Sequence, residues 1–251
     1  MDMADTRFAR QFYRHQIMLK EIGTKGQQKL SNARVAVMGV GGLGSVSSLY
    51  IALAGVGYIR VIDQDILEPH NLHRQILYTH DDLGYLKAKA ASKQLQKHNP
   101  TILVEAIVEN INAHNIEHLL HNVDVVVDGL DNMPTRHLVN SACIKRGIPY
   151  VFGAAIGLEG NLTVFQPPKT GCLECLIPNN QNTYTTGDTR GIMGATAGTI
   201  GNLQALETIK LITGAGTPLI GKLLVCDFTD MNFTTIDITK NPTCPTCSRE
   251  L

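Results

Sequence analysis

A short glycine-rich segment constrains the fold of this chain more than any other feature. Residues 39–44 fit the pattern G-x-G-x-x-G, with Gly39, Gly41, Gly42 and Gly44 among them. The segment follows the apolar run 35–38 and opens a stretch of helical spacing at 43–54, the strand–turn–helix context that gives the pattern its meaning. Glycines let the backbone approach a phosphate, and the helix N-terminus supplies N–H groups and partial positive charge. We therefore expect these four glycines to bind a nucleotide.

Strand-like and helix-like patterns alternate along the first 152 residues. Apolar runs at 35–38, 58–62, 102–108, 123–127 and 150–152 alternate with helical stretches at 43–54, 84–98 and 135–145. This alternation predicts an α/β fold of Rossmann type, with a mostly parallel sheet covered by helices on both faces. Residues 7–30 carry a broadly helical pattern, in which Gly23 and Gly26 are expected to be breaks.

The character of the chain changes after Gly153. Strand-like runs at 161–165, 222–227 and 233–238 are separated by Gly, Pro and Thr and interrupted by a helical stretch at 195–213. We expect one domain, 1–251, in which N-terminal helices (1–32) precede a nucleotide-binding half (33–152) and a second half (153–251) that extends the sheet with antiparallel strands. The polar, turn-rich residues 178–191 are expected to form an exposed, mobile loop.

Charge and hydropathy exclude several classes of protein. The 22 basic and 22 acidic residues cancel, which argues against a dedicated binder of nucleic acid or membrane surfaces. The apolar stretches fall short of the roughly 18–20 residues that cross a membrane, and the charged start precedes no apolar signal segment. We expect a cytoplasmic protein, whose six cysteines serve metal binding or catalysis before disulfides.

Charged residues decide which nucleotide fits the glycine motif. Asp63 ends the next predicted strand, 19 residues beyond Gly44, where a carboxylate binds ribose hydroxyls. ATP carries about four negative charges, so its site needs fixed cations and a carboxylate that holds Mg²⁺. Arg74, Lys87 and Asp131 (expected to close the fourth strand) supply both. Taken singly, Arg74 and Lys87 are also compatible with solvated surface charges.

Two cysteine pairs suit a metal. Cys172 and Cys175, and Cys244 and Cys247, form two C-x-x-C pairs, and such pairs suit tetrahedral zinc. A redox-active pair is the alternative. Four thiolates leave no open position on the ion, so we expect structural zinc without a catalytic role. The other cysteines, Cys143 and Cys226, are expected to be buried small apolar residues.

Several motifs in order resemble those of the MoeB/ThiF family (HesA/MoeB/ThiF adenylyltransferases), small relatives of ubiquitin-activating enzymes. The resemblance covers about residues 12–248. The matching segments are the glycine motif, residues 63–75 (Asp-Gln-Asp-Ile-Leu-Glu-Pro-His-Asn-Leu-His-Arg-Gln), Lys87, Asp131-Asn132, residues 153–156 (Gly-Ala-Ala-Ile), Glu159-Gly160 and the two cysteine pairs.

The resemblance implies that the protein joins the C-terminal Gly-Gly carboxylate of a ubiquitin-fold sulfur carrier to AMP, using ATP and Mg²⁺ and releasing pyrophosphate. It implies that residues 153–251 bind the carrier and that the protein is a homodimer. Carried over by position, Asp63 binds ribose and Gly42 lies against the nucleotide. Asn71, Arg74 and Lys87 are implied to hold the phosphates, and Asp131 to help place Mg²⁺. Asn132 is implied as a further nucleotide-binding residue.

The chain departs from the family pattern in two places. Many relatives carry a cysteine after the first C-x-x-C that forms a thioester or persulfide with the carrier, and residues 183–190 contain none. We favour a protein that stops at the acyl adenylate, which a separate sulfur donor attacks; a distant cysteine is the alternative. The family's Arg-Tyr-x-Arg-Gln reads Phe-Tyr-Arg-His-Gln at 12–16. His15 therefore takes the place of the arginine that reaches the partner subunit, and Arg14 is the adjacent catalytic candidate.

Three functions compete. The leading one is an adenylyltransferase acting on a sulfur carrier in molybdopterin or thiamine synthesis, tRNA thiolation or protein modification. The second is a nucleotide-binding scaffold that holds the carrier without activating it. The third, a nicotinamide dehydrogenase, is disfavoured by Arg74, Lys87 and Asp131.

Overall fold

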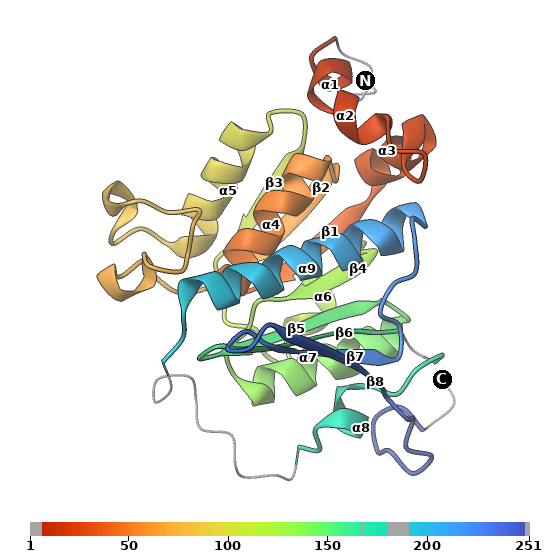
Figure 1. The fold of residues 1–251 in the computed structure, drawn as a ribbon. Helices are drawn as coiled ribbons and strands as arrows, with labels where there is room; N and C mark the ends of the chain where they lie inside the picture. The colour runs from red at the N-terminus through yellow and green to blue at the C-terminus, as the bar shows by residue number, and fades with distance from the viewer. Residues whose placement is uncertain (1–6, 167, 180–190, 249–251) are drawn as a thin grey trace.

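The computed structural model describes residues 7–166, 168–179 and 191–248, and within them it contains one sheet of eight strands (Figure 1). The strand order is β3-β2-β1-β4-β5-β6-β7-β8. Strands β1 to β5 are parallel, and β6 to β8 extend the sheet in antiparallel fashion. Their bounds are β1 Arg34–Met38, β2 Tyr58–Ile62, β3 Leu103–Ile107, β4 Val125–Asp128, β5 Tyr150–Ile156, β6 Glu159–Phe165, β7 Lys222–Asp227 and β8 Asn232–Asp237.

Helices cover both faces of the sheet. On one face, α4 (Gly42–Ala54), α5 (Lys87–His98) and α9 (Gly194–Thr213) bury a core with Val35, Val37 and Val127. On the other, α6 (Ile116–Leu119) and α7 (Met133–Arg146) enclose a second core with Ala36 and Met38. Alternate residues of β1 serve opposite cores, because successive side chains of a strand point to opposite faces. Burial on both faces explains why the central strands read as continuous apolar runs. The predicted α/β class, with a mostly parallel sheet and helices on both faces, is confirmed.

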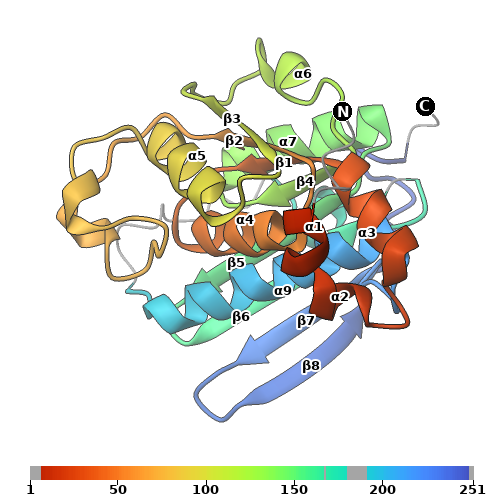
Figure 2. The ribbon, with the colours of Figure 1, turned by 90° about the horizontal axis from the view of Figure 1, so that it is seen from above.

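Short helices complete the fold. The bounds of the N-terminal helices are α1 Arg7–Phe12, α2 Arg14–Ile17 and α3 Gly23–Asn32, and the others are α8 Leu173–Leu176 and the 3-10 turns η2 Pro69–Asn71 and η3 His80–Asp82. Figure 2 shows the first three helices beside one another, and β7 and β8 on the opposite side of the sheet from β3 and α5. None of the described helices is long and apolar enough to cross a membrane.

The structure corrects three local predictions. Gly26 does not break a helix but lies buried within α3, where a Cβ would come 3.1 Å from the Ile22 side chain. The helix expected from residue 84 begins at Lys87, because Gly84 has φ +80° and Leu86 is extended. Strand β4 ends at Asp128, so Asp131 lies beyond the strand rather than closing it. Of the expected mobile loop 178–191, residues 180–190 lie outside the described residues.

Candidate functional site

The loop between β1 and α4 is fixed by close backbone packing. Gly39 has φ +86°, in the left-handed region that favours glycine. A Cβ on Gly44 would lie 1.9 Å from the Gly39 carbonyl oxygen, and a Cβ on Gly129 would lie 2.2 Å from it. No side chain fits at these contacts, so the glycines hold the start of α4 against the loops after β1 and β4.

The same loop leaves the backbone around Gly41 and Gly42 open at the N-terminus of α4. We call this part of the glycine loop the cradle. The helix has no side-chain cap at Gly41, so its first-turn N–H groups stay available to an anion. A Cβ on Gly42 would stand 3.6 Å from Cδ of Arg74, and one on Gly41 would stand 3.7 Å from Nε2 of Gln75. Arg74 therefore lies alongside the glycine loop, where a phosphate bound to the helix would sit.

Asp63 follows β2 and braces the glycine loop. Its carboxylate accepts hydrogen bonds from the backbone N–H groups of Val40 (2.9 Å) and Asp65 (2.8 Å). Burial raises the pKa of Asp63, while these two N–H groups and Lys87 oppose the shift. Because β2 and β1 are parallel neighbours, their carboxyl ends meet at one edge, as the sequence predicted. The structure thus places Asp63 beside the cradle.

Lys87 is a buried cation rather than a solvated one. Its side chain is 8% exposed, and Nζ donates to Oδ2 of Asp65 at 2.8 Å. Since few lysines are buried without a partner, the surface-charge interpretation of Lys87 is wrong. Asn71 is also buried, and its Oδ1 accepts the Glu68 N–H at 3.1 Å, which fixes the turn that leads to Arg74.

Arg74 is held by its own loop. It is half-buried, and its Nη1 donates to the carbonyl oxygen of His70 at 2.7 Å and lies 2.9 Å from Nε2 of His73. Arg74 therefore stands next to the cradle with its guanidinium still engaged with neighbouring residues. A phosphate in the cradle would compete with the His70 carbonyl for this cation.

Asp131 and Asn132 lie in the loop that leads from β4 to α7. Asp131 is exposed, and Nδ2 of Asn132 donates to its Oδ1 at 3.2 Å. Oδ1 of Asn132 accepts the Thr135 N–H at 3.0 Å and so caps α7. Asn132 therefore has a structural role besides the nucleotide-binding role predicted for it. The Asp131 carboxylate is exposed and so accessible to a cation, which suits a carboxylate that holds Mg²⁺.

A buried ion pair beneath this loop was not predicted. Asp128 is fully buried, and its Oδ2 lies 3.0 Å from Nε of Arg136 on α7. Nη2 of Arg136 also donates to the carbonyl oxygens of Leu130 (2.6 Å) and Gly153 (2.9 Å). Burial raises the pKa of Asp128, with Arg136 opposing the shift. Arg136 thereby ties the loop that carries Asp131 to β5. The one available sequence cue was an arginine on the apolar face of a predicted helix.

Arg14 lies away from the cradle of its own chain. The neighbouring Tyr13 and Gln16 contact the other end of α4, where Nε2 of Gln16 donates to the Ala54 carbonyl at 2.9 Å. The 13 residues of α4 separate this end from Gly42, a length of about 20 Å. The structure therefore does not bring Arg14, which is exposed, together with the other predicted site residues of the same chain.

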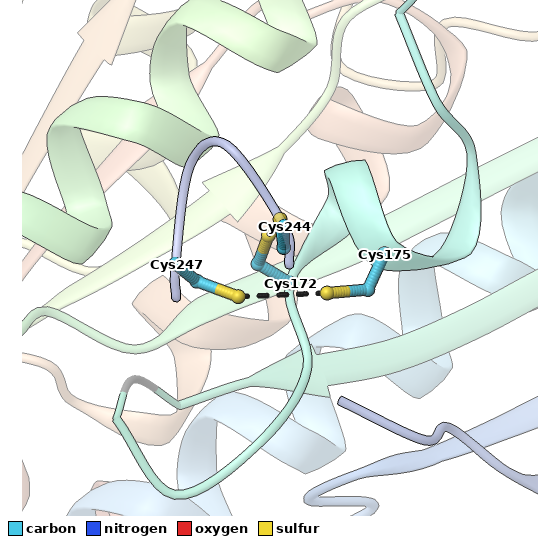
Figure 3. A group of neighbouring side chains, drawn as sticks. All are labelled: Cys172, Cys175, Cys244 and Cys247. Carbon is cyan, nitrogen blue, oxygen red and sulfur yellow. Dashed lines mark hydrogen bonds between the residues drawn. The ribbon is translucent and has the colours of Figure 1, made fainter. Parts of the chain in front are cut away.

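The four predicted cysteines form one cluster (Figure 3). Their sulfur atoms all lie within 4.8 Å of one another; Cys172 and Cys244 are 3.8 Å apart, and Cys175 and Cys247 are 3.5 Å apart. A tetrahedron of sulfurs about 2.3 Å from zinc has edges of about 3.8 Å. None of the four is in a disulfide. The donor set and its spacing therefore fit a zinc ion.

Polar groups of α7 support the cysteine cluster. Oδ1 of Asn140 accepts the Leu173 N–H at 3.0 Å, and Nδ1 of His137 lies 3.0 Å from Oε2 of Glu174. These contacts fix the turn between the first two cysteines. Such outer contacts orient the ligands of metal sites. Cys143 and Cys226 are buried, as predicted.

The cradle lies between β1 and β4, where the order of the strands in the sheet reverses. Successive strands run outward from β1 toward β3 on one side and toward β8 on the other, and open α/β sheets bind nucleotides at such switch points. The chain thus has the sheet topology and the glycine loop that define the class of nucleotide-binding α/β folds. Within that class it belongs to the ThiF family, whose model matches residues 13–246.

Similar proteins agree with this assignment. The chain is 40% identical over 237 residues to the SAMP-activating enzyme E1 of Haloferax volcanii, covering 94% of this chain and 87% of that one. It is 39% identical over 245 residues to the sulfur carrier protein adenylyltransferase of Thermus thermophilus, covering 95% and 90%. A crystal structure of Escherichia coli MccB with ATP superposes with a TM-score of 0.82 at 26% identity, covering 99% and 76%. The chain is an adenylyltransferase of the MoeB/ThiF type.

Proposed function

We propose that the protein adenylates the C-terminal Gly-Gly carboxylate of a ubiquitin-fold sulfur carrier, giving an acyl adenylate and pyrophosphate. The relatives named above, a sulfur carrier adenylyltransferase among them, support the substrate class. The structural observation that carries the proposal is the buried Lys87 paired with Asp65 next to a glycine cradle that Arg74 flanks. Two cations at a helix N-terminus suit a triphosphate better than a redox dinucleotide.

Each site residue has a role that matches its position. Asp63 accepts hydrogen bonds from the ribose hydroxyls, and the N–H groups at Gly41 and Gly42 contact phosphate oxygens. Arg74 and Lys87 neutralise the triphosphate, with Asn71 beside them. Asp131, with Asn132, would hold Mg²⁺, and the ion would neutralise charge on the phosphates.

The chemistry needs positioning and charge neutralisation rather than a protein nucleophile. An oxygen of the carrier carboxylate forms a bond with the α-phosphorus, and the bond from that phosphorus to the oxygen bridging to the β-phosphate breaks. Pyrophosphate leaves with the electron pair of that bond. Arg74 and Lys87 are held by the His70 carbonyl and Asp65, and both exchange these partners for phosphate oxygens when ATP enters.

The cysteine inventory favours release of the acyl adenylate to a separate sulfur donor. All six cysteines of the chain lie in the described part, four of them in the metal-type cluster. Burial raises the pKa of the Cys143 thiol and that of Cys226, so neither presents a thiolate to a carrier. The residues 183–190, which lack a cysteine, fall outside the described residues.

Two further assignments belong to the same proposal. The four cysteines bind structural zinc, for which their sulfur spacing is suited. The protein works as a homodimer in which Arg14 approaches the phosphates bound by the partner copy, since α4 separates it from the cradle of its own chain.

Pyrophosphate exchange against ATP, run with each candidate carrier, tests the proposal. We expect exchange with one carrier, and we expect Asp131→Ala to reduce it by about 100-fold while carrier binding is retained. Glu21→Ala, which removes an exposed carboxylate near the N-terminus, is the matched control. Carrier binding without exchange in the wild-type protein would instead support the scaffold function.

A further inference from the structure

Strand β3 forms one edge of the sheet, because among the described residues it pairs only with β2. The Leu103 N–H donates to the Gly57 carbonyl, and the Ile107 carbonyl accepts the Asp63 N–H. Residues 103, 105 and 107 therefore direct their backbone groups toward β2, and Val104 and Ala106 direct theirs outward. The Val104 carbonyl accepts the Ser92 hydroxyl at 3.0 Å. Within the described residues, the Val104 N–H and both backbone groups of Ala106 have no partner.

A basic groove runs beside this edge. It has a volume of about 450 Å³ and is lined by Lys89, Ser92, Lys93, Gln96, Lys97 and Ala106. The three lysines are exposed and stand at i, i+4 and i+8 of α5, on one face of the helix. Helix α5 contains no acidic residue, and none of these lysines forms an ion pair with another described residue. Figure 2 shows α5 beside β3, at the end of the sheet away from β8.

The spacing of the lysines matches that of an extended chain. Residues four apart in a helix are about 6 Å apart along its axis, and alternate residues of a strand are about 6.6 Å apart. An extended peptide that runs along β3 can therefore present one acidic side chain to each of Lys89, Lys93 and Lys97. The three lysines repel one another, because like charges at i and i+4 of a helix are unfavourable. Without an acidic partner, this row of lysines is therefore electrostatically unfavourable.

Protection of the edge against aggregation is the simplest alternative role for these lysines. Protected edges are very short, carry charged residues, proline or a bulge, or are covered by a helix or loop. Strand β3, Leu103-Val104-Glu105-Ala106-Ile107, has no lysine or proline, and Leu103 is 58% exposed. Its one charged residue, Glu105, is paired with Arg60 at 2.6 Å. The edge therefore remains open to pairing.

We infer that the edge of β3 and the lysine groove bind an extended acidic segment of a partner protein, which adds to the sheet as a further strand. The backbone groups of Val104 and Ala106 pair with the backbone of the segment, and alternate Asp or Glu side chains meet the lysines. Strand addition of this kind takes affinity from main-chain hydrogen bonds and specificity from alternate side chains. A nucleic acid would satisfy the charges but would not continue the ladder. The inference does not depend on the proposed adenylation.

The charge requirement is tested with a fluorescent peptide of alternating Glu and Val. We expect wild-type protein to bind it at low salt, and the variant Lys89→Glu/Lys93→Glu/Lys97→Glu to bind at least about tenfold more weakly. A peptide with Lys in place of Glu should not bind. The matched control, Lys20→Glu/Lys25→Glu, reverses two exposed lysines on the N-terminal segment and should bind as wild type does. The midpoint of urea unfolding, measured in every variant, verifies that the fold is intact.

Hydrogen exchange tests the ladder. Peptide addition should slow exchange of the Val104 and Ala106 amides in the wild-type protein, and Ala106→Pro, which removes one donor, should weaken binding by about fivefold. Either of two results with the acidic peptide overturns the inference: no binding, or binding with neither amide protected. Equal affinity for an oligothymidylate, unaffected by Ala106→Pro, would likewise show a plain polyanion surface.

Discussion

Arg136→Met tests whether the buried ion pair under the β4–α7 loop governs both stability and catalysis. Asp128 is fully buried and Arg136 is about 10% exposed on its side chain, with 3.0 Å between Nε and Oδ2. Removing one partner of such a pair leaves a charge buried without compensation, which costs about 3–5 kcal/mol. In a domain of this size, that loss lowers Tm by about 6–20 °C. Methionine preserves much of the side-chain volume, so cavity formation contributes little.

The pH dependence of the stability lost in Arg136→Met shows whether the uncompensated Asp128 carboxylate causes the loss. Burial already raises the pKa of Asp128 in the wild-type protein, against the effect of Arg136, and loss of Arg136 raises it further. A carboxyl whose folded pKa lies above its unfolded value, about 3.9, stabilises the fold fully below that value and loses the effect as pH rises through the folded pKa. The destabilisation of Arg136→Met relative to wild type should therefore shrink as pH falls from 7 toward 5.

Urea unfolding at several pH values, with pyrophosphate exchange at pH 7, measures these effects. The double variant Asp128→Leu/Arg136→Met should recover about half of the lost stability, because no buried charge remains. Exchange in the folded single variant should fall, since Arg136 also binds the Leu130 carbonyl next to Asp131. A loss under about 1 kcal/mol, or one that does not depend on pH, would refute the argument.

Four other predictions follow from the cradle and the cysteine cluster. Asp65→Asn frees a buried cation and should raise ATP affinity by up to about fivefold in calorimetry; a decrease would contradict competition between Asp65 and phosphate. Lys87→Met should lower ATP affinity at least about tenfold in the same assay, because it removes a charged donor. Because burial raises the pKa of Asp63, adenosine affinity should fall as pH drops through a range above its ordinary value of about 3.9, and Asp63→Asn should abolish that dependence in fluorescence titrations. Metal analysis should find one zinc per chain, lost in Cys244→Ser together with several degrees of Tm and retained in Cys226→Ala.

The order of strands and helices was predictable, because apolar runs and glycines report on burial and turns that are local in the chain. The glycine motif and Asp63 were predictable for the same reason: strand ends that are parallel neighbours meet at one edge. The boundary errors also have local causes. Asp131 was assigned to the end of β4, but the strand ends at Asp128, whose carboxylate accepts the Leu130 N–H at 2.9 Å and turns the chain there.

Contacts between distant segments could not be predicted. The pairing of Arg136 with Asp128 depends on how α7 packs under the sheet, and the binding of the Asp128 carbonyl by Nε2 of Gln204 on α9 (2.7 Å) joins residues 76 positions apart. Lysine is a residue type that is usually exposed, but the side chain of Lys87 is buried and paired with Asp65. No pattern within a single segment specifies such partners. They are determined by how the helices pack against the sheet in the folded protein.

The positions of the four cysteines along the chain determine when, during synthesis of the protein, their cluster can form. Two ligands precede α9, β7 and β8, and the other two follow them. Because synthesis proceeds from the N-terminus and domains begin to fold as they emerge, the glycine cradle can form while the second cysteine pair is still unmade. On the proposed zinc assignment, metal capture follows formation of the glycine cradle, and chains made without zinc should keep the cradle while the segment that carries Cys244 and Cys247 stays untied.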